Sequence, residues 1–237
     1  MVNSKRVLAV VPARGGSKGV PLKNLRKING VPITVIAGKL AQEIQEINRV
    51  VISTDHSGIA EVCGEHGLDV PFYRPKEISG DRIGDLEVLR HALLETEMLE
   101  RDKYDAVVML QPTSPLRKKE HVLGAINLFL SSDYDSVWTV SPTDLKYHPL
   151  KTLSVDERGT LSFYDDKGAE IIARQQLVPT YHRNGAAYVI SRDCILNQNS
   201  IMGKSSAAYI INEPMISIDT EEDIKLVEEQ FNKLNIK

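Results

Sequence analysis

Glycines and basic side chains are concentrated in the segment from Arg14 to Asn24, directly after a short apolar run. The segment contains three glycines and the three cations Arg14, Lys18 and Lys23. Glycines let the backbone come close to a ligand and direct N–H groups toward it, and the cations offset negative charge. A polyphosphate needs both features, so the segment predicts a polyphosphate-binding loop. Its spacing matches neither the Walker pattern nor the G-x-G-x-x-G fingerprint, and a solvated basic turn would have the same composition.

Three further polar residues stand at the ends of apolar runs: Arg74, Gln111 and Asp219. On residue type alone, each has an ordinary structural role. Arg74 precedes a proline and would suit the surface, and Gln111 would suit a turn whose backbone groups it satisfies. Asp219, together with Thr220 and Asp223, resembles the cap of a helix, where acidic residues are favoured.

The apolar pattern predicts an alternation of strands and helices that would position these residues. Uninterrupted β-prone runs are typical of strands buried on both faces of a parallel sheet. Such runs predict strands at 7–11, 49–55, 70–73, 106–110, 136–140, 186–190, 210–211 and 215–218. Apolar residues at helical spacing predict helices at 33–47, at 57–66, around 86–93, around 123–129 and after residue 219. The alternation favours an α/β fold with a Rossmann-like, mostly parallel sheet that carries helices on both faces.

Parallel strands joined by right-handed crossovers end at the same edge of a sheet. The polar segments after the first, second and fourth predicted strands would therefore meet at that edge, where open α/β sheets bind ligands. The glycine-rich loop and Gln111 belong to these segments. The sequence thus predicts one binding site at this edge of the sheet.

The alternation stops after residue 140. Two turns, at 156–159 and 165–168, lie among β-prone residues and predict hairpins that project from the sheet. We therefore divide the chain into an α/β domain, residues 1–140 and 182–237, and an inserted arm, residues 141–181. Because such an arm has little core of its own, we expect it to pack on a second copy of the chain.

The composition is that of an ordinary globular protein and argues against some functions. Lys and Arg total 29 against 32 for Asp and Glu, which does not fit a protein that coats nucleic acid. The apolar run near the N-terminus is too short to span a membrane. The two cysteines, Cys63 and Cys194, lie far apart and suit a reducing compartment. We expect a cytoplasmic protein that binds neither nucleic acid nor membrane.

Longer motifs resemble one family, the acylneuraminate cytidylyltransferases or CMP-sialic acid synthetases. The likeness begins with Pro12 to Asn24 and runs in the family's order over nearly the whole chain. The further segments that carry it are 110–117, 147–151, 174–177, 184–186 and 218–223. The resemblance implies a nucleotidyltransferase-type α/β domain with a dimerisation arm, and hence a homodimer. It also implies CTP as the donor, a sialic-acid-type nonulosonic acid as the acceptor, and Mg²⁺ as the cofactor.

The resemblance also implies roles for individual residues. CTP would be bound by Arg14, Gly15, Ser17, Lys18, Lys23, Asn24 and Arg74. The sugar would be bound by Gln111, Lys151, Arg174 and Asn184, and the two arm residues could act in the partner's active site. Catalysis would rest on Arg14, Lys23, Gln111 and Asp219, the last as the Mg²⁺ ligand. In the implied reaction the anomeric hydroxyl of the sugar attacks the α-phosphorus of CTP, and pyrophosphate leaves in line.

Two departures from the family pattern leave the acceptor open. The family typically has aspartates at both positions where this chain has Ser217 and Asp219, and a hydroxyl is a poorer ligand for a hard cation than a carboxylate. In this respect the chain is similar to the Kdo cytidylyltransferases, which act on an eight-carbon sugar acid. His182 and Arg183 stand where the family often has Arg-Pro, beside the expected sugar pocket. A catalytically silent nucleotide-binding homologue is another alternative. A glycosyltransferase that uses a nucleotide sugar is a third, but it would normally need an Asp-x-Asp metal motif after a central strand, and none stands at 110–112.

Overall fold

A twisted sheet forms the centre of the computed structural model, which describes residues 5–17 and 19–234. Within these residues the sheet has six strands in the order β10-β6-β9-β5-β1-β4. Their bounds are β1 Val7–Pro12, β4 Arg49–Ser53, β5 Ala106–Met109, β6 Ser136–Pro142, β9 Tyr181–Ser191 and β10 Ser206–Ile210. β1 is parallel to both β4 and β5, and β10 is parallel to β6, whereas β9 lies antiparallel between β5 and β6. The expected mostly parallel α/β sheet is confirmed.

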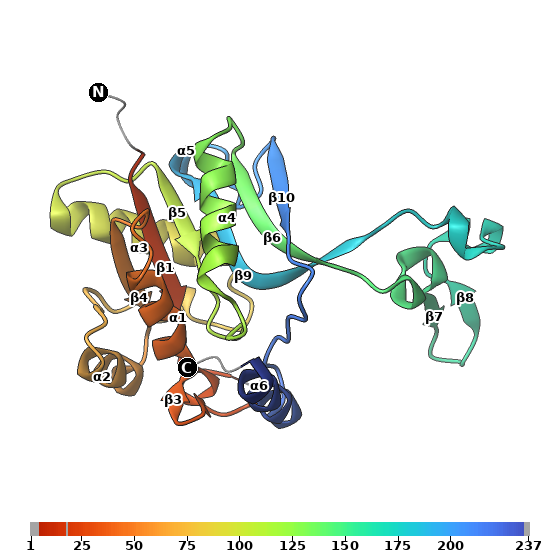
Figure 1. The fold of residues 1–237 in the computed structure, drawn as a ribbon, viewed down its shortest axis with the longest axis horizontal. Helices are drawn as coiled ribbons and strands as arrows, with labels where there is room; N and C mark the ends of the chain where they lie inside the picture. The colour runs from red at the N-terminus through yellow and green to blue at the C-terminus, as the bar shows by residue number, and fades with distance from the viewer. Residues whose placement is uncertain (1–4, 18, 235–237) are drawn as a thin grey trace.

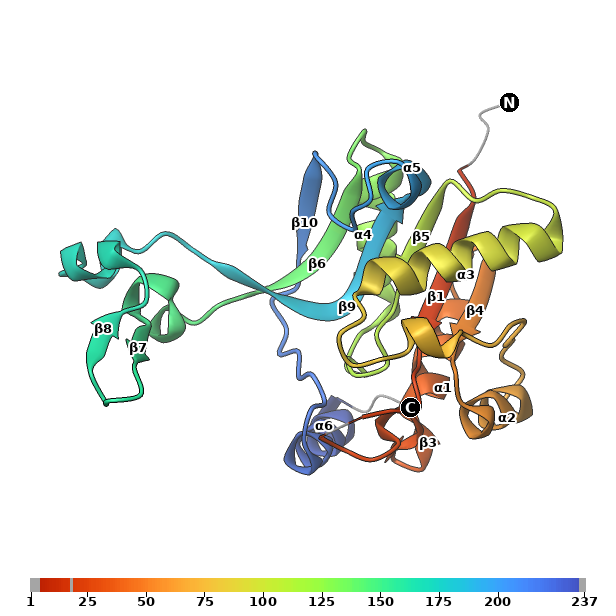
Figure 2. The ribbon, with the colours of Figure 1, turned by 180° about the vertical axis from the view of Figure 1, so that it is seen from behind.

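Helices cover both faces of this sheet (Figures 1 and 2). One face carries α1 (Ile33–Gln42), α2 (Ser57–Glu65) and α4 (Lys119–Leu130). The other carries α3 (Asp85–Glu100) and α5 (Arg192–Leu196).

Each face of the sheet packs against its helices in a hydrophobic core, and consecutive residues of β1 point into the two cores alternately. Val7 packs in the core with α1, α2 and α4, and Leu8 packs in the core with α3 and α5. Both side chains are fully buried, which is why the strand is apolar without interruption.

The C-terminal helix α6 (Glu221–Leu234) packs away from the sheet against a small third cluster. This cluster contains Val20 from the glycine-rich loop and Ile28 from the short hairpin of β2 (Lys27–Ile28) and β3 (Val31–Pro32). The segment before α6 is attached to the loop after β5, because the Ile218 N–H donates to the Thr113 carbonyl at 2.8 Å. These contacts bring the two ends of the sequence to the same edge of the sheet.

The arm leaves the body between β6 and β9 and extends far to one side of it (Figure 1). β6 and β9 still pair at Pro142 and Tyr181, so residues 143–180 form the projecting part. It contains a hairpin of β7 (Leu153–Val155) and β8 (Leu161–Phe163). The 3-10 helices of the described chain, most of them in the arm, are Lys23–Leu25, Lys76–Ile78, Leu145–Tyr147, Pro149–Lys151, Asp166–Glu170 and Arg174–Gln176.

Three predicted elements differ from the structure. The first helix ends at Gln42 because the chain turns back to the sheet, where Val7 and Asn48 exchange hydrogen bonds of 2.7 and 2.9 Å. Residues 70–73 contribute only the bridge between Tyr73 and Thr54. Residues 215–218, predicted as a strand, form an irregular connection. In the described part of the chain, no helix is both long enough and apolar enough to cross a bilayer.

Candidate active site

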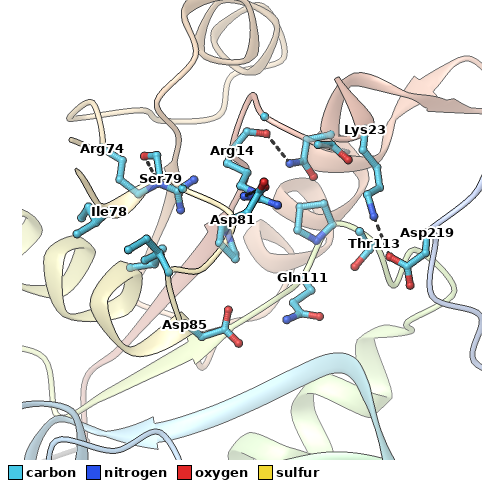
Figure 3. Close-up of a pocket in the computed structure, with 18 of the residues that line it drawn as sticks. Arg14, Lys23, Arg74, Ile78, Ser79, Asp81, Asp85, Gln111, Thr113 and Asp219 are labelled. Atoms are coloured by element: carbon cyan, nitrogen blue, oxygen red, sulfur yellow. Dashed lines mark hydrogen bonds and ion pairs between the residues drawn. The ribbon is translucent and has the colours of Figure 1, made fainter. Parts of the chain in front are cut away.

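A cavity of about 440 Å³ lies at the edge of the sheet where β1 and β5 end. Figure 3 shows the side chains that surround it. Its wall includes Arg14, Gly16, Ser17, Lys23, Asn24, Arg74, Ser79, Asp81, Asp85, Gln111, Thr113, Ser217 and Asp219. Of the three polar segments predicted to meet at this edge, those after β1 and β5 line the cavity, and the segment before α6 joins them. The segment after β4 does not line it but contacts the glycine-rich loop through Asp55.

The glycine-rich loop is held in place by hydrogen bonds between its backbone and polar side chains. The Gly15 N–H donates to Asp55 Oδ1 at 2.8 Å, and a Cβ at this residue would lie 2.6 Å from the His56 ring. A Cβ at Gly16 would meet nothing within 4 Å, so this residue borders open space in the cavity wall. Asn24 is buried, and its Nδ2 donates to the Arg14 carbonyl at 2.9 Å. Asn24 thus closes the loop on itself; Lys18 lies outside the described residues.

Basic side chains line the cavity from two elements. Arg14 pairs with Asp81 at 2.7 Å. Arg74 is only 4% exposed, and its Nε donates to Ser79 Oγ at 3.2 Å. Its terminal nitrogen Nη2 lies 3.9 Å from Asp55 Oδ1. Burial lowers the pKa of Arg74, with the nearby Asp55 charge acting in the opposite direction. A buried guanidinium beside a polar cavity is suited to a ligand that brings negative charge or hydrogen-bond acceptors.

Lys23 and Asp219 form an ion pair at the opposite side of the cavity. Lys23 Nζ lies 2.8 Å from Asp219 Oδ1 and also donates to the Ile218 carbonyl at 2.9 Å. Capping of α6 does not involve the Asp219 carboxylate. The Asp223 carboxylate accepts from Thr220 N–H at 2.8 Å, and Thr220 Oγ1 accepts from Asp223 N–H at 3.2 Å. The Asp219 side chain, 73% exposed, is therefore available to a ligand.

The donor set at Asp219 fits a magnesium ion that is bound mainly through its substrate. No group of three or more His, Cys, Asp or Glu side chains suited to a metal occurs among the described residues. Asp219 and the hydroxyl-bearing Ser217 line the cavity together. Mg²⁺ commonly takes one or two carboxylates and completes its shell with phosphate oxygens and water. The single carboxylate of Asp219 is therefore compatible with a Mg²⁺ ion that a bound polyphosphate would share.

Gln111 enters the cavity from the end of β5 and is supported by β9. Its N–H donates to the Gly185 carbonyl at 3.3 Å, and its own carbonyl accepts from the Arg117 guanidinium. Arg117 is 2% exposed, and burial lowers its pKa to about 9. Gly185 has φ +67°, and a Cβ there would lie 2.5 Å from Gln111 Oε1. The Gln111 side chain therefore packs against a backbone that has room only for glycine.

Three predicted sugar-binding residues do not reach this cavity within one chain. Asn184 is buried; its Oδ1 accepts from Thr139 Oγ1 at 2.7 Å and its Nδ2 donates to Ser141 at 3.1 Å. Lys151 and Arg174 lie in the arm and line a separate, largely apolar hollow there. Asn184 thus connects β6 and β9, while the two basic residues stand far from the body.

Several residues of the cavity wall were not predicted from the sequence. Asp81 and Ser79 follow Arg74 in a loop without strong periodicity, and Asp85 is the first residue of α3. An acidic residue before an apolar helical pattern was the available signal for Asp85. That signal is ambiguous, because acids favour helix N-termini for structural reasons as well.

Known proteins that are similar to this chain belong to the cytidylyltransferases. The family model described as cytidylyltransferase matches residues 8–234. The CMP-N,N'-diacetyllegionaminic acid synthase of Legionella pneumophila is 32% identical over 92% of both chains. The N-acylneuraminate cytidylyltransferase of Streptococcus agalactiae is 32% identical over 91% of this chain, which spans 51% of that longer protein. A structure of CMP:2-keto-3-deoxy-manno-octonic acid synthetase complexed with CTP superposes with a TM-score of 0.72 over 97% of this chain and 99% of that one. At 16% identity it shows the fold alone.

Proposed function

Since the chain belongs to the cytidylyltransferase family, we propose that it transfers CMP from CTP to the anomeric hydroxyl of a sialic-acid-type nonulosonic acid. The observation that carries the proposal is the single cavity that joins the glycine-rich loop, three cations and the Asp219 carboxylate. The names of the two sequence relatives favour a nonulosonic acid as the acceptor. The acceptor oxygen forms a bond to the α-phosphorus of CTP, and the bond from that phosphorus to the bridging oxygen of pyrophosphate breaks. Pyrophosphate leaves with the electron pair of that bond, and the proton of the acceptor hydroxyl is released to water.

The residues of the cavity have distinct roles in this reaction. Arg14 and Lys23 bind the triphosphate and offset the charge that develops on the phosphoryl and pyrophosphate oxygens. Buried Arg74 binds the nucleoside side of CTP, where its guanidinium can donate to acceptor atoms. Gln111 orients the sugar acid with its amide. Arg74 is held by its hydrogen bond to Ser79, and the backbone of Gln111 is held by Gly185 and Arg117, so these two groups need little reorganisation when charge builds up.

Asp219 would hold a Mg²⁺ ion, together with phosphate oxygens and water. When bound, this ion supplies positive charge to the phosphoryl oxygens and lowers the barrier to displacement. Lys23, which pairs with Asp219 in the structure, would donate to phosphate oxygens when the triphosphate is bound. We leave Ser217, which also lines the cavity, out of the proposed ligand set because a hydroxyl is a poorer ligand for a hard cation than a carboxylate.

A turnover assay tests the proposal. The protein is incubated with CTP, Mg²⁺ and one of three sugar acids: N-acetylneuraminic acid, N,N'-diacetyllegionaminic acid or Kdo. Pyrophosphate release is measured, and ATP in place of CTP serves as the control. We expect release with CTP and at least one of the two nonulosonic acids.

The other outcomes separate the alternatives. Release with Kdo alone would support the eight-carbon acceptor, which the serine at position 217 favours. Binding of CTP in calorimetry without release in any mixture would identify a silent homologue. Equal release with ATP would contradict the assignment of cytidine as the nucleoside.

A further inference from the structure

Asp55 places a carboxylate just behind the wall of the cavity that would bind CTP. It follows β4 in the chain, its side chain is 22% exposed, and it does not line the cavity itself. Like charges repel, so a carboxylate this close to the cavity opposes the binding of a triphosphate. Asp55 contacts both the glycine-rich loop and Arg74, which indicates a role that compensates for this repulsion.

The usual structural roles do not account for a charged residue at this position. An acid between a strand and a helix commonly caps the helix. Here the N-cap of α2 is His56, whose Nδ1 accepts from the Gly58 N–H at 3.2 Å. The Asp55 carboxylate instead accepts from the Gly15 N–H at 2.8 Å. A neutral asparagine could also accept that hydrogen bond, so the loop contact alone does not explain the charge.

The charge of Asp55 faces the Arg74 guanidinium. The backbone aligns the two residues, because the Arg74 N–H donates to the Thr54 carbonyl at 2.7 Å. Ser79 accepts from Arg74 Nε, whereas Nη2 lies 3.9 Å from Asp55 Oδ1, which is too long for a hydrogen bond. Among the described residues this buried Nη2 has no hydrogen-bond partner. Its N–H groups are therefore held near a carboxylate that does not use them.

A second arginine explains why Arg74 requires a carboxylate beside it. Arg14 and Arg74 both lie in the upper part of the view in Figure 3. Burial lowers the pKa of Arg74, the Arg14 charge lowers it further, and the Asp55 charge raises it. Arg14 has its own partner, Asp81, which lines the cavity and can be displaced by a ligand. Asp55 lies outside the wall, so its contact with Arg74 can persist when the cavity is filled.

We propose that Asp55 is a positioning residue whose charge holds the Arg74 guanidinium in place for CTP. The same carboxylate fixes the glycine-rich loop through Gly15, so one side chain sets two parts of the CTP site relative to each other. Asp55 itself contacts no substrate and acts through Arg74. This inference rests on the proposed function and adds a residue that aligns its nucleotide site.

Calorimetric titration of Asp55→Asn with CTP and Mg²⁺ tests the inference. The asparagine keeps the shape of the side chain and an acceptor for Gly15 but removes the charge. We expect the Kd for CTP to rise about 10-fold, as for one misplaced hydrogen bond. If Asp55 were only a negative charge near the phosphates, its removal would lower the Kd instead. Asp69→Asn is the matched control and should leave the Kd unchanged, because Asp69 pairs with Arg49 outside the cavity wall.

A double-mutant cycle with Arg74 separates positioning from a general effect on the fold. Arg74→Met keeps the buried stem of the side chain but removes the guanidinium. In this background Asp55→Asn should change the Kd for CTP by less than about twofold, since no guanidinium is left to position. An equal factor in both backgrounds would overturn the inference, and so would a Kd that falls or stays constant in Asp55→Asn alone. Thermal melts check that the variants are folded, and Asp55→Ser replaces Asp55→Asn if it is not.

Failure of the proposed function would give a different pattern of results. CTP binding needs no acceptor, so the cycle can be measured even if no sugar acid yields pyrophosphate. A wild-type protein that does not bind CTP would contradict the proposed function itself, whereas a wild type that binds CTP with an unaffected Asp55→Asn contradicts only the role of Asp55. In the turnover assay the KM for the sugar acid should stay within about twofold in Asp55→Asn, because the residue acts on the nucleotide site.

Discussion

At the scale of single residues, the charged groups of the cavity are held by partners that a substrate can replace. Lys23 contacts Asp219 and the Ile218 carbonyl, and Arg14 contacts Asp81. These pairs lie partly in solvent, so each contributes little to stability. A triphosphate offers stronger, charge-assisted partners to the same cations. We therefore expect CTP to replace these partners through movements of the side chains.

Replacement of Lys23 by alanine should therefore impair activity without unfolding the protein. A hydrogen bond to a charged group contributes about 1.5–3 kcal/mol, so kcat/KM for CTP should fall about 10- to 100-fold. Lys27→Ala is the matched control, since Lys27 is exposed on β2 and lies outside the cavity wall. Pyrophosphate release measures the effect, and circular dichroism checks the fold. Activity of Lys23→Ala equal to that of Lys27→Ala would remove the phosphate role.

The raised pKa of Asp85 gives a prediction for stability. Desolvation raises this pKa above its ordinary value of 3.8, with Arg183 opposing and Glu87 reinforcing the shift. In the interval above 3.8 the folded state binds more protons than the unfolded state, so the free energy of unfolding decreases as the pH rises. Asp85→Asn should hence be more stable than the wild type at pH 7, because burial outweighs the lost dipole interaction.

Denaturant titrations of both proteins at several pH values check this expectation. The advantage of Asp85→Asn should shrink as the pH falls toward 3.8 and vanish below it, where Asp85 is protonated in both states. A variant that is less stable at pH 7 would show that Asp85 is structural.

At the scale of elements, the junction between β5 and β9 fixes the side of the cavity on which we propose that the sugar acid binds. Gly185 lies at a positive φ of +67°, and both Gln111 Oε1 and Ser114 Oγ approach within 2.5 Å of where a Cβ would be. The Arg117 guanidinium, buried beneath, donates to the backbone carbonyls of Gln111 and Gly185. This junction gives Gln111 one position, which is what orientation of a substrate requires.

Gly185→Ala should consequently reduce activity more than a substitution that only strains the backbone. Gly159→Ala is a close control, because Gly159 also has a positive φ, +82°, but nothing lies within 4 Å of its added Cβ. Both variants should lose about 1 kcal/mol of stability from strain. Only Gly185→Ala should also displace Gln111 and raise the KM for the sugar acid. Equal kinetics of the two variants in the pyrophosphate assay would show that the Gln111 position does not matter.

Periodicity in the sequence predicted most of these elements but fewer of their contacts. Val7–Val11 and Ala106–Leu110 were identifiable because strands buried on both faces lack polar residues. The antiparallel direction of β9 was not, since a short apolar run is compatible with either direction. Arg117 and Asp85 were missed because their significance depends on which backbone or cavity they face. Family motifs located Arg14, Lys23, Gln111 and Asp219, all of which line the cavity.

At the scale of the whole molecule, the arm is notable for the apolar surface that it exposes. Its apolar side chains include Tyr147, Val155, Leu161, Tyr164, Ile172 and Val178, each more than 60% exposed. Such a concentration on a projecting segment is typical of an interaction surface. Lys151 and Arg174 lie beside it, away from the cavity of their own chain. A symmetric dimer would cover the apolar surface and, by its symmetry, bring each arm close to the other subunit.

We therefore predict that Arg174 acts in the active site of the partner subunit, which a complementation experiment can reveal. Lys23→Ala and Arg174→Ala are each expected to be weakly active as homodimers. After the two are unfolded together and refolded, half of the dimers are mixed, and each mixed dimer has one site with both residues intact. Activity should return to about a quarter of the wild-type level.

The result distinguishes the two arrangements because they predict opposite outcomes. If Arg174 served the cavity of its own chain, every subunit in the mixture would lack one of the two residues, and no activity would return. Light scattering on the same samples checks that dimers are present. A monomeric wild-type protein with full activity would contradict the partner role outright, since the cavity would then work without an arm from outside.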